Sequence, residues 1–386
     1  MGRTLNILPA TTLDYRRLAE RRLPRFLFDY IDGGANDEIT LANNVGDFQK
    51  IRIRQRVLID VSNTDTSTQL AGEPADMPVV LAPVGMAGLY ARRGEVQAVR
   101  AANAKNVPFT LSTVGICPLD EVRAAASKPF WFQLYMIRDR ATVRNLLERA
   151  MGAGCTTLVF TIDLPLAGMR HRDTRNGMLD NSLRGKLGKA WQLGARPGWI
   201  VDVGVRGKPH SFGNLADLVP DPTDLKAYRT WIDAQFDTSV TWRDIEWLRG
   251  IWKGQLILKG IQEPEDALGA AEVGADGLVV SNHGARQLDS VHSSISKLPG
   301  VVAALGKRLE IYVDGGVRSG LDVFKAVALG ARGVMIGRPW AWALAAGGEA
   351  AIAGLLATFK KELEVAMALS GVTAIGQICG DQIDPM

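Results

Sequence analysis

The chain has 386 residues, of which 47% are hydrophobic and 22% charged, with 45 Lys and Arg against 41 Asp and Glu. This globular composition excludes an intrinsically disordered chain and a small disulfide-stapled protein. The net charge of +4 is too small for a protein face that follows nucleic-acid phosphates, so we expect no nucleic-acid partner.

We expect no secretory signal, because the sequence becomes charged at Asp14 before a long apolar segment has formed. The three cysteines, Cys117, Cys155 and Cys379, are far apart and have no partner at metal-ligand spacing. We therefore expect a reducing compartment and no bound metal.

Eight short apolar runs follow a helical extension that we place at residues 1–75. They lack polar alternation, as expected for strands covered on both faces. Stretches rich in Ala, Leu, Glu and Arg with helical periodicity separate most of them. Strand then helix, repeated eight times, predicts an α/β fold of the (β/α)8 TIM-barrel type. The predicted strands are residues 79–82, 109–112, 131–135, 158–163, 256–259, 278–281, 311–314 and 333–337.

One interval between the predicted strands is too long. The fourth and fifth strands are separated by about 70 residues more than a βα unit needs, which predicts an insertion over residues 164–254. We expect a single domain over 1–386, with the barrel at 76–345 and a C-terminal helical segment at 346–386. A doubly wound sheet is the alternative, but no Gly-x-Gly-x-x-Gly motif follows an early strand.

Residues 340–359 are apolar enough to suggest a transmembrane helix, since Glu349 is their only charged residue. Gly347 and Gly348 interrupt this run at its centre. The interruption favours one helix ending and another starting over a membrane span.

Polar residues gather where the predicted strands end, and in a TIM barrel these ends face the active site. Residues 314–320 after strand seven and 336–339 after strand eight contain glycines and the arginines Arg318 and Arg338. Glycine backbone N–H groups, a helix N-terminus and guanidinium donors together suit a phosphate. The sequence therefore predicts a ligand that carries a phosphate, although glycine-rich turns alone would explain either segment.

His283 follows strand six and is the one histidine at a predicted strand end. A neutral imidazole accepts protons near pH 7, and Arg286, three residues later, could hold a carboxylate with two parallel hydrogen bonds. Asp163, at the end of strand four, could orient the imidazole and stabilise its cation. A purely structural histidine is the alternative.

Lys259 closes strand five, and two roles fit that place. A neutral lysine at a barrel strand end could form a Schiff base with a carbonyl substrate. A charged lysine could instead stabilise a cofactor that becomes anionic, because a charge pair about 4 Å apart at an effective dielectric of 20 gains roughly 4 kcal/mol before desolvation.

Eight short motifs occur in a fixed order along the chain, at residues 23–26, 29–35, 82–85, 131–135, 259–260, 281–284, 314–318 and 337–338. Through these motifs the sequence resembles, from about Asp14 to Leu369, the FMN-dependent L-2-hydroxy-acid dehydrogenases and oxidases. Residues 91–98 and 108–114 are most similar to the quinone-linked lactate dehydrogenase branch of that family. Gly85, where some oxidases of the family carry alanine, favours a dehydrogenase.

The resemblance implies oxidation of a small 2-hydroxy acid, with L-lactate to pyruvate as the first candidate and mandelate or a longer acid as the alternative. It makes His283 the base, Asp163 its partner, Arg286 and Arg170 the carboxylate clamp, and Tyr30 and Tyr135 hydroxyl contacts to substrate. It further implies an FMN site made of Pro83, Val84, Gly85, Ser112, Gln133, Thr161, Lys259, Ser281, Asp314, Gly316, Arg318, Gly337 and Arg338.

Two residues depart from the family pattern. Ala285 stands where family members usually have glycine, and Ser290 replaces a frequent glycine. If position 285 needs a positive φ, alanine costs about 1 kcal/mol or more and could redirect Arg286.

Residues 184–208 of the insertion carry six Lys or Arg against Asp202 alone, interleaved with Leu, Ile and Trp. Such a segment suits an anionic membrane surface, and a solvated active-site lid is the alternative. Membrane contact predicts a peripheral protein on the cytoplasmic face of the inner membrane with a quinone acceptor. A soluble, oxygen-using, cytoplasmic oxidase and a catalytically silent barrel that binds a phosphorylated ligand remain open, and the resemblance suggests a homotetramer.

Overall fold

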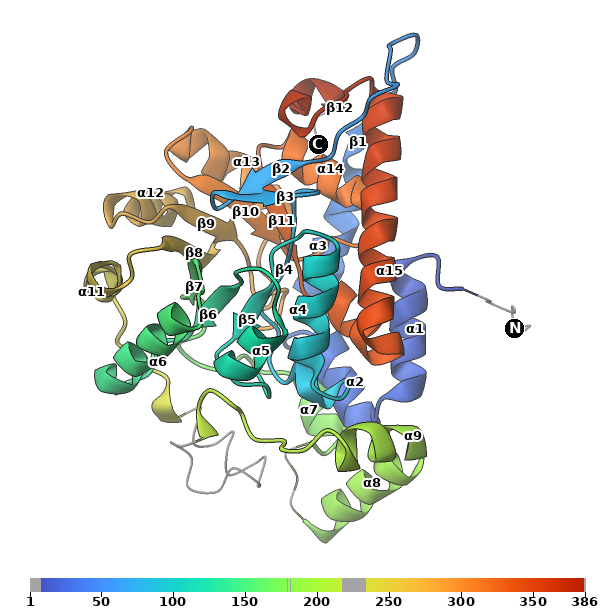
Figure 1. Cartoon of the computed structure of the whole chain (residues 1–386), viewed down its shortest axis with the longest axis vertical. Coiled ribbons are helices and arrows are strands. Elements are labelled where there is room, and N and C mark those ends of the chain that lie inside the picture. The colour runs from blue at the N-terminus through green and yellow to red at the C-terminus, as the bar shows by residue number, and fades with distance from the viewer. Residues whose placement is uncertain (1–7, 179, 181, 217–233, 385–386) are drawn as a thin grey trace.

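Eight parallel strands form a barrel at the centre of the molecule (Figure 1), in a computed structural model that describes residues 8–178, 180, 182–216 and 234–384. The sheet order is β4-β11-β10-β9-β8-β7-β6-β5, and a parallel bridge from Leu81 to Phe109 brings its two edges together. The predicted TIM barrel is confirmed. Its strands are β4 (Val79–Leu81), β5 (Thr110–Ser112), β6 (Trp131–Leu134), β7 (Thr157–Thr161), β8 (Gln255–Ile261), β9 (Gly277–Val280), β10 (Glu310–Asp314) and β11 (Gly333–Ile336).

The barrel is closed at the N-terminal ends of its strands. The hairpin of β2 (Thr68–Leu70) and β3 (Glu73–Ala75) packs Leu70 and Ala71 against the inner layer of barrel side chains. In that layer the rings of Trp131 and Tyr312 meet edge to face, with 6.0 Å between centroids. The backbone N–H of Ala71 donates to the Tyr312 hydroxyl over 2.9 Å. Ligands therefore enter from the C-terminal end, the side that barrels use for chemistry.

Helices surround the barrel and extend it at both chain ends. Of the outer helices, α1 lies side by side with the long helix α15, on the right in Figure 1. The helices are α1 (Thr12–Arg22), α2 (Arg25–Asp32), α3 (Ile39–Lys50), α4 (Gly94–Ala104), α5 (Leu119–Ala125), α6 (Arg140–Gly152), α11 (Trp242–Ile251), α12 (Pro264–Glu272), α13 (Ser294–Leu305), α14 (Gly320–Ala328) and α15 (Arg338–Ser370); short elements are β1 (Arg52–Ile53), η1 (Ala87–Leu89), η4 (Ile375–Gln377), η5 (Gly380–Gln382) and β12 (Ile383–Asp384).

The interruption predicted in residues 340–359 lies inside α15. Gly347 and Gly348 have non-helical backbone angles, with φ of −163° and +67°, so the helix breaks there. By length and composition α15 could cross a membrane, but 44% of its most apolar window is buried inside the protein. Trp340 and Trp342, near its start, are among the buried residues. These features are those of a core helix that packs against α1, α4 and α14.

The segment after β7 forms a lobe beyond the C-terminal end of the barrel, at the bottom of Figure 1. It contains α7 (His171–Arg175), α8 (Leu183–Gly194), α9 (Pro197–Trp199) and the π-helical turn η2 (Ile200–Val205), and it returns to the barrel through α11. Residues 217–233 of the predicted insertion lie outside the described residues. The division of the chain into extension, barrel, insertion and C-terminal segment stays a prediction.

Replacing Ser290 by glycine is expected to stabilise the protein. Ser290 is exposed and has a φ of +61°, a left-handed conformation that glycine adopts without steric cost. We expect the free energy of unfolding to rise by about 1 kcal/mol, measured by urea titration. As a control, Ser127→Gly at an exposed position without a positive φ should lower it, and a loss of stability in Ser290→Gly would contradict the assigned strain.

Candidate active site

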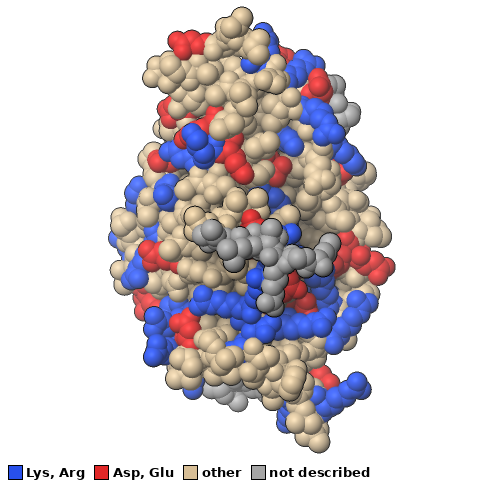
Figure 2. Space-filling view, turned by 90° about the vertical axis from the view of Figure 1, so that its right-hand side faces the viewer, with Lys and Arg blue, Asp and Glu red and all other residues tan. Residues whose placement is uncertain are grey.

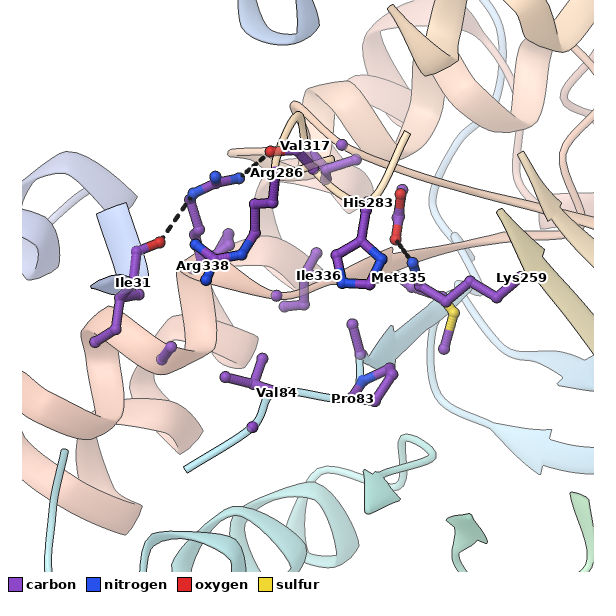
Figure 3. A pocket seen from close by; sticks show the side chains of 18 of the residues that line it. Ile31, Pro83, Val84, Lys259, His283, Arg286, Val317, Met335, Ile336 and Arg338 are labelled. Atoms are coloured by element: carbon purple, nitrogen blue, oxygen red, sulfur yellow. Dashed lines mark hydrogen bonds and ion pairs between the residues drawn. The ribbon is translucent and has the colours of Figure 1, made fainter. Parts of the chain in front are cut away.

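A cavity opens at the C-terminal end of the barrel. Figure 3 shows His283, Arg286 and Arg338 pointing into it above Pro83 and Val84, with Lys259 to one side. The predicted site residues that line it are Tyr30, Pro83, Val84, Gly85, Tyr135, Thr161, Lys259, His283, Arg286, Asp314, Gly316, Arg318, Gly337 and Arg338. Ser112, Gln133, Ser281, Asp163 and Arg170 are not in its lining. Ser281, Asp163 and Arg170 each contact a lining residue, namely Lys259, His283 and Tyr30. Ser112 accepts from the backbone N–H of the lining residue Val114 over 3.3 Å, and Gln133 lies behind Ser112.

The imidazole of His283 is paired with Asp163, as the sequence predicts. Its Nδ1 atom lies 2.7 Å from Asp163 Oδ1. Burial raises the pKa of Asp163, but the charge and hydrogen bond of His283, together with the nearby Lys259 ammonium, outweigh burial and hold that pKa below its usual value. An ionised carboxylate can only accept a hydrogen bond, so Nδ1 carries a proton. In the neutral form of the ring, Nε2 is then the atom that can accept a proton from a substrate.

The segment that carries His283 is a left-handed turn. His283, Gly284 and Ala285 have φ values of +56°, +61° and +62°. Position 285 therefore needs the positive φ that makes alanine costly, yet Arg286 still reaches the cavity, so the departure from glycine does not remove it from the site. Such strain persists only where surrounding contacts hold it.

A buried pair of asparagines holds this turn. The amides of Asn44 on α3 and Asn282 donate to each other over 2.9 Å in both directions. Asn282 Oδ1 also accepts from the backbone N–H of Ala285 over 3.0 Å. Because both amides are buried, each would lose a satisfied hydrogen bond if the turn relaxed. Sequence analysis missed Asn44, since nothing local marks an exposed-looking helix position as the partner of a loop 238 residues away.

Two arginines flank Tyr30 at one end of the cavity. The guanidinium carbons of Arg286 and Arg170 lie 4.8 and 5.4 Å from the centre of its ring. Arg286 also donates to the backbone carbonyl of Tyr30 over 2.5 Å, and Arg170 to Asp173 over 2.9 Å. Burial and the charge of Arg170 lower the pKa of Arg286. A carboxylate placed beside this pair would compensate the repulsion.

Arg318 and Arg338 form a second basic group at the predicted phosphate end. Arg338 donates to the carbonyls of Ile31, Gly33 and Gly284 over 3.1, 2.8 and 2.8 Å. These hydrogen bonds fix the orientation of its guanidinium group. Burial lowers the pKa of Arg318 to about 10, and burial with the charges of Arg286 and Arg318 lowers the pKa of Arg338. Buried guanidinium groups that repel one another are expected where an anion binds.

The glycine loop after β10 approaches α3 too closely for any side chain. A Cβ atom on Gly316, whose φ is +98°, would lie 1.9 Å from the carbonyl oxygen of Asn44. The loop is followed by α14, whose N-cap Ser319 accepts from the backbone N–H of Asp322. A glycine loop leading into a helix N-terminus beside two arginines has the donor set of a phosphate site.

Lys259 is a fixed cation. It is 4% exposed, and its ammonium lies 2.9 Å from both Asp314 Oδ2 and the hydroxyl of Ser281. Burial alone would lower its pKa, but Asp314 and Asp163 outweigh burial and raise it. A Schiff-base lysine needs a neutral amine. The second of the two predicted roles, stabilisation of an anionic partner, is the one that this environment favours.

The remaining polar groups around the cavity fit FMN. Gln133 Nε2, Thr161 Oγ1 and Asp314 Oδ1 are buried and have no hydrogen-bond partner within the described structure. Ser112 donates to Gln133 Oε1 over 3.1 Å, which orients the amide. Unpaired buried groups are rare unless a ligand satisfies them. Together with the cation of Lys259 and the phosphate end, they suit a heterocycle with polar edges and a phosphorylated chain.

Tyr90 is a cavity residue that the sequence reasoning missed. It follows the 3-10 turn η1, is fully buried, and donates to the carbonyl of Gly85 over 2.8 Å. It belongs to no motif at a strand end, and its apolar neighbours resemble an ordinary core segment.

Comparison with known proteins agrees with this geometry. A family model described as FMN-dependent dehydrogenase matches residues 19–385. The chain is 54% identical over 372 residues to an L-lactate dehydrogenase of Caulobacter vibrioides, covering 96% of this chain and 97% of the relative. It is 52% identical over 375 residues to an L-lactate dehydrogenase of Ectopseudomonas mendocina, covering 97% of this chain and 98% of the relative.

Solved structures give the same result. A crystal structure of the monotopic membrane protein (S)-mandelate dehydrogenase superposes with a TM-score of 0.92 at 32% identity, covering 99% of this chain and 100% of that one. A mandelate oxidase superposes with a TM-score of 0.82 at 34% identity, covering 98% of both chains. The sequence match over nearly the whole length, the barrel and the FMN-compatible cavity lead to one conclusion: the chain belongs to the family of FMN-dependent dehydrogenases.

Proposed function

We propose that the protein oxidises an L-2-hydroxy acid to the 2-oxo acid, with L-lactate as its first substrate. The observation that carries this proposal is the pairing of His283 with Asp163 in the same cavity as Arg286. A base and a carboxylate-binding group placed together match a substrate whose hydroxyl and carboxylate are on neighbouring carbons. FMN, when bound, accepts the two electrons that the substrate loses.

The chain's own residues divide the remaining work. Arg286 and Arg170 bind the substrate carboxylate, and the hydroxyls of Tyr30 and Tyr135 orient the substrate. His283 takes a proton at Nε2 and Asp163 stabilises the resulting cation. Lys259 would provide a positive charge that stabilises the cofactor when it becomes anionic. The groups that would hold FMN are Pro83, Val84, Gly85, Ser112, Gln133, Thr161, Ser281, Asp314, Gly316, Arg318, Gly337 and Arg338.

The relatives support lactate over mandelate as the substrate. Relatives that share 54 and 52% of their residues with this chain are named L-lactate dehydrogenase, whereas the mandelate enzymes share 32 and 34%. The test is kcat/KM for L-lactate, D-lactate, glycolate and (S)-mandelate with an artificial acceptor. We expect L-lactate to give the largest value and D-lactate to be inactive. A larger value for (S)-mandelate would replace lactate with an aromatic substrate.

A membrane location and a quinone acceptor complete the proposal. The helix α8 exposes Leu183, Leu187 and Trp191, at 75, 63 and 81%. Helices α8 and α9 form the lower end of the molecule in Figure 1. Figure 2 shows a band of Lys and Arg side chains just above that end. An apolar surface beside a basic one suits an anionic bilayer. The protein would act at the cytoplasmic face of the inner membrane. It would assemble as a homotetramer, as the family resemblance suggests.

Charged substitutions on α8 are expected to weaken membrane binding. Each large apolar side chain contributes about 1.5–3 kcal/mol when it leaves water, so Leu187→Glu with Trp191→Glu should lower binding to phosphatidylglycerol vesicles at least about tenfold. Co-sedimentation measures it. Val365→Glu, at an exposed position of α15, is the matched control and should bind like the parent. Equal vesicle binding by the parent, the double variant and the control would assign α8 to a solvated lid instead. In a separate assay, rapid dioxygen consumption by the parent enzyme with L-lactate would favour an oxidase over a quinone-linked dehydrogenase.

A further inference from the structure

A second cavity adjoins the active site and shares two lining residues with it. It lies between the C-terminal ends of β6 and β7 and the beginning of α11, so its walls come from the two ends of the insertion after β7. No role in the proposed chemistry uses it. Its described lining consists of Tyr135, Met136, Phe160, Thr161, Ile162, Leu164, Pro165, Asp237, Thr238, Val240, Thr241, Trp242 and Ile245.

The walls of this cavity are mostly apolar and partly aromatic, with the hydroxyls of Thr161, Thr238 and Thr241 as polar members. Met136, Phe160 and Ile245 are buried, and Trp242 is 36% exposed. The one charged lining side chain described, Asp237, accepts from Arg140 over 2.6 Å, and Arg140 also donates to Asp244 over 2.7 Å. An anionic ligand would therefore meet carboxylates without a free cation, and the cavity suits an uncharged planar ring with few polar groups.

The second cavity shares Tyr135 and Thr161 with the active site. The ring of Tyr135 stacks on the imidazole of His283, with 6.5 Å between the ring centroids. It also contacts the ring of Phe236, with 5.1 Å between the centroids. His283 and Arg286 line the first cavity and are absent from the described lining of the second. Only the side chain of Tyr135 therefore separates a molecule in the second cavity from His283, while the base and the carboxylate clamp stay free for substrate.

We propose that this second cavity binds the ring of the quinone that reoxidises the enzyme. The inference rests on the proposed function and deepens it by giving the acceptor a place separate from the substrate. The 2-hydroxy acid loses two electrons and two protons when it becomes the 2-oxo acid. The quinone gains two electrons and two protons when it becomes the quinol, so the exchange by way of the bound cofactor balances.

Separate places for substrate and acceptor have a kinetic consequence. The 2-oxo acid product competes with the 2-hydroxy acid for the arginines, but it does not compete with the quinone for an apolar cavity. We therefore expect pyruvate to be a competitive inhibitor against L-lactate and not to raise the apparent KM for quinone. Competition between pyruvate and quinone would place both in one cavity and overturn the proposal.

The direct test fills the cavity without touching the active site. Val240→Trp adds an indole to its wall, and because overpacking excludes a ligand, the KM for a one-isoprene ubiquinone should rise about tenfold or more. The rate of anaerobic flavin reduction by L-lactate should stay unchanged. Val365→Trp, exposed on α15, is the matched control and should alter neither quantity. A second variant, Trp242→Ala, removes an aromatic wall and should weaken quinone binding in the same assay.

Binding is measured independently of turnover through the fluorescence of Trp242. The same ubiquinone should quench the fluorescence of the parent holoenzyme more than that of Trp242→Phe, and Val240→Trp should shift the quenching to higher quinone concentration. An unchanged quinone KM in both cavity variants overturns the proposal. So does slower flavin reduction in Val240→Trp, which would assign the cavity to the substrate's side chain. Failure of the proposed function is distinct, because the parent itself would then show no reduction by L-lactate.

Discussion

Replacing His283 by glutamine will slow anaerobic flavin reduction by L-lactate by about 10²–10⁴-fold, while the protein keeps its FMN. Glutamine can still donate a hydrogen bond to Asp163 and fills much the same space, but it cannot take up the substrate's proton. The groups assigned to FMN, among them Gln133, Arg318 and Arg338, do not depend on the imidazole. Stopped-flow absorbance gives the rate, and the flavin-to-protein ratio gives the occupancy.

Two further variants show whether the effect belongs to the pair of His283 and Asp163. Asp163→Asn alone should also slow reduction, and the double variant should lose little more than His283→Gln, since groups that act as a unit are not additive. His292→Gln, in the same loop but outside the described cavity lining, should reduce flavin like the parent. Unaltered reduction in His283→Gln would remove the histidine from the chemistry.

Replacing Arg286 by methionine is the change with the second-largest expected effect. Removing one partner of a buried charge pair costs about 2–5 kcal/mol, so kcat/KM for L-lactate should fall by roughly 10²–10³-fold, mostly through KM. Arg286→Lys should recover part of this loss, because it restores the charge but not the two-pronged donor. The steady-state rate over a range of lactate concentrations measures both variants.

The stability of the Arg286 variant provides a second readout. In the free protein, burial and Arg170 disfavour the charge of Arg286, so its loss relieves repulsion and the variant should unfold near the parent's temperature. Added pyruvate should raise the melting temperature of the parent and not that of Arg286→Met, because ligand stabilisation follows affinity. Arg243→Met, an exposed arginine on α11, should respond to pyruvate like the parent. Equal stabilisation of all three proteins would contradict the carboxylate clamp.

The barrel could be predicted from sequence because its signals are local. A strand covered on both faces is a short apolar run, and all eight predicted runs overlap the observed strands. The position of Lys259, His283 and Asp314 at one end of the barrel followed directly, since parallel strands put their carboxyl ends on the same side.

Contacts made by backbone atoms could not be predicted in this way. Backbone carbonyls of Tyr30, Ile31 and Gly33 accept hydrogen bonds from Arg286 and Arg338. Every residue has a backbone carbonyl, so the sequence does not indicate which of them will accept. The two hydrogen bonds between the side-chain amides of Asn44 and Asn282 likewise depend on how α3 packs against the barrel. Tyr30 was found through resemblance alone. The second cavity has no motif either, because it arises where two separate ends of the insertion meet.

Anaerobic addition of L-lactate to the purified holoenzyme tests the central claim most directly. The account predicts that the oxidised flavin absorbance disappears, in proportion to L-lactate added up to one equivalent per site, and that D-lactate leaves it unchanged. A flavin that keeps its oxidised spectrum with L-lactate, glycolate and (S)-mandelate alike would contradict the account.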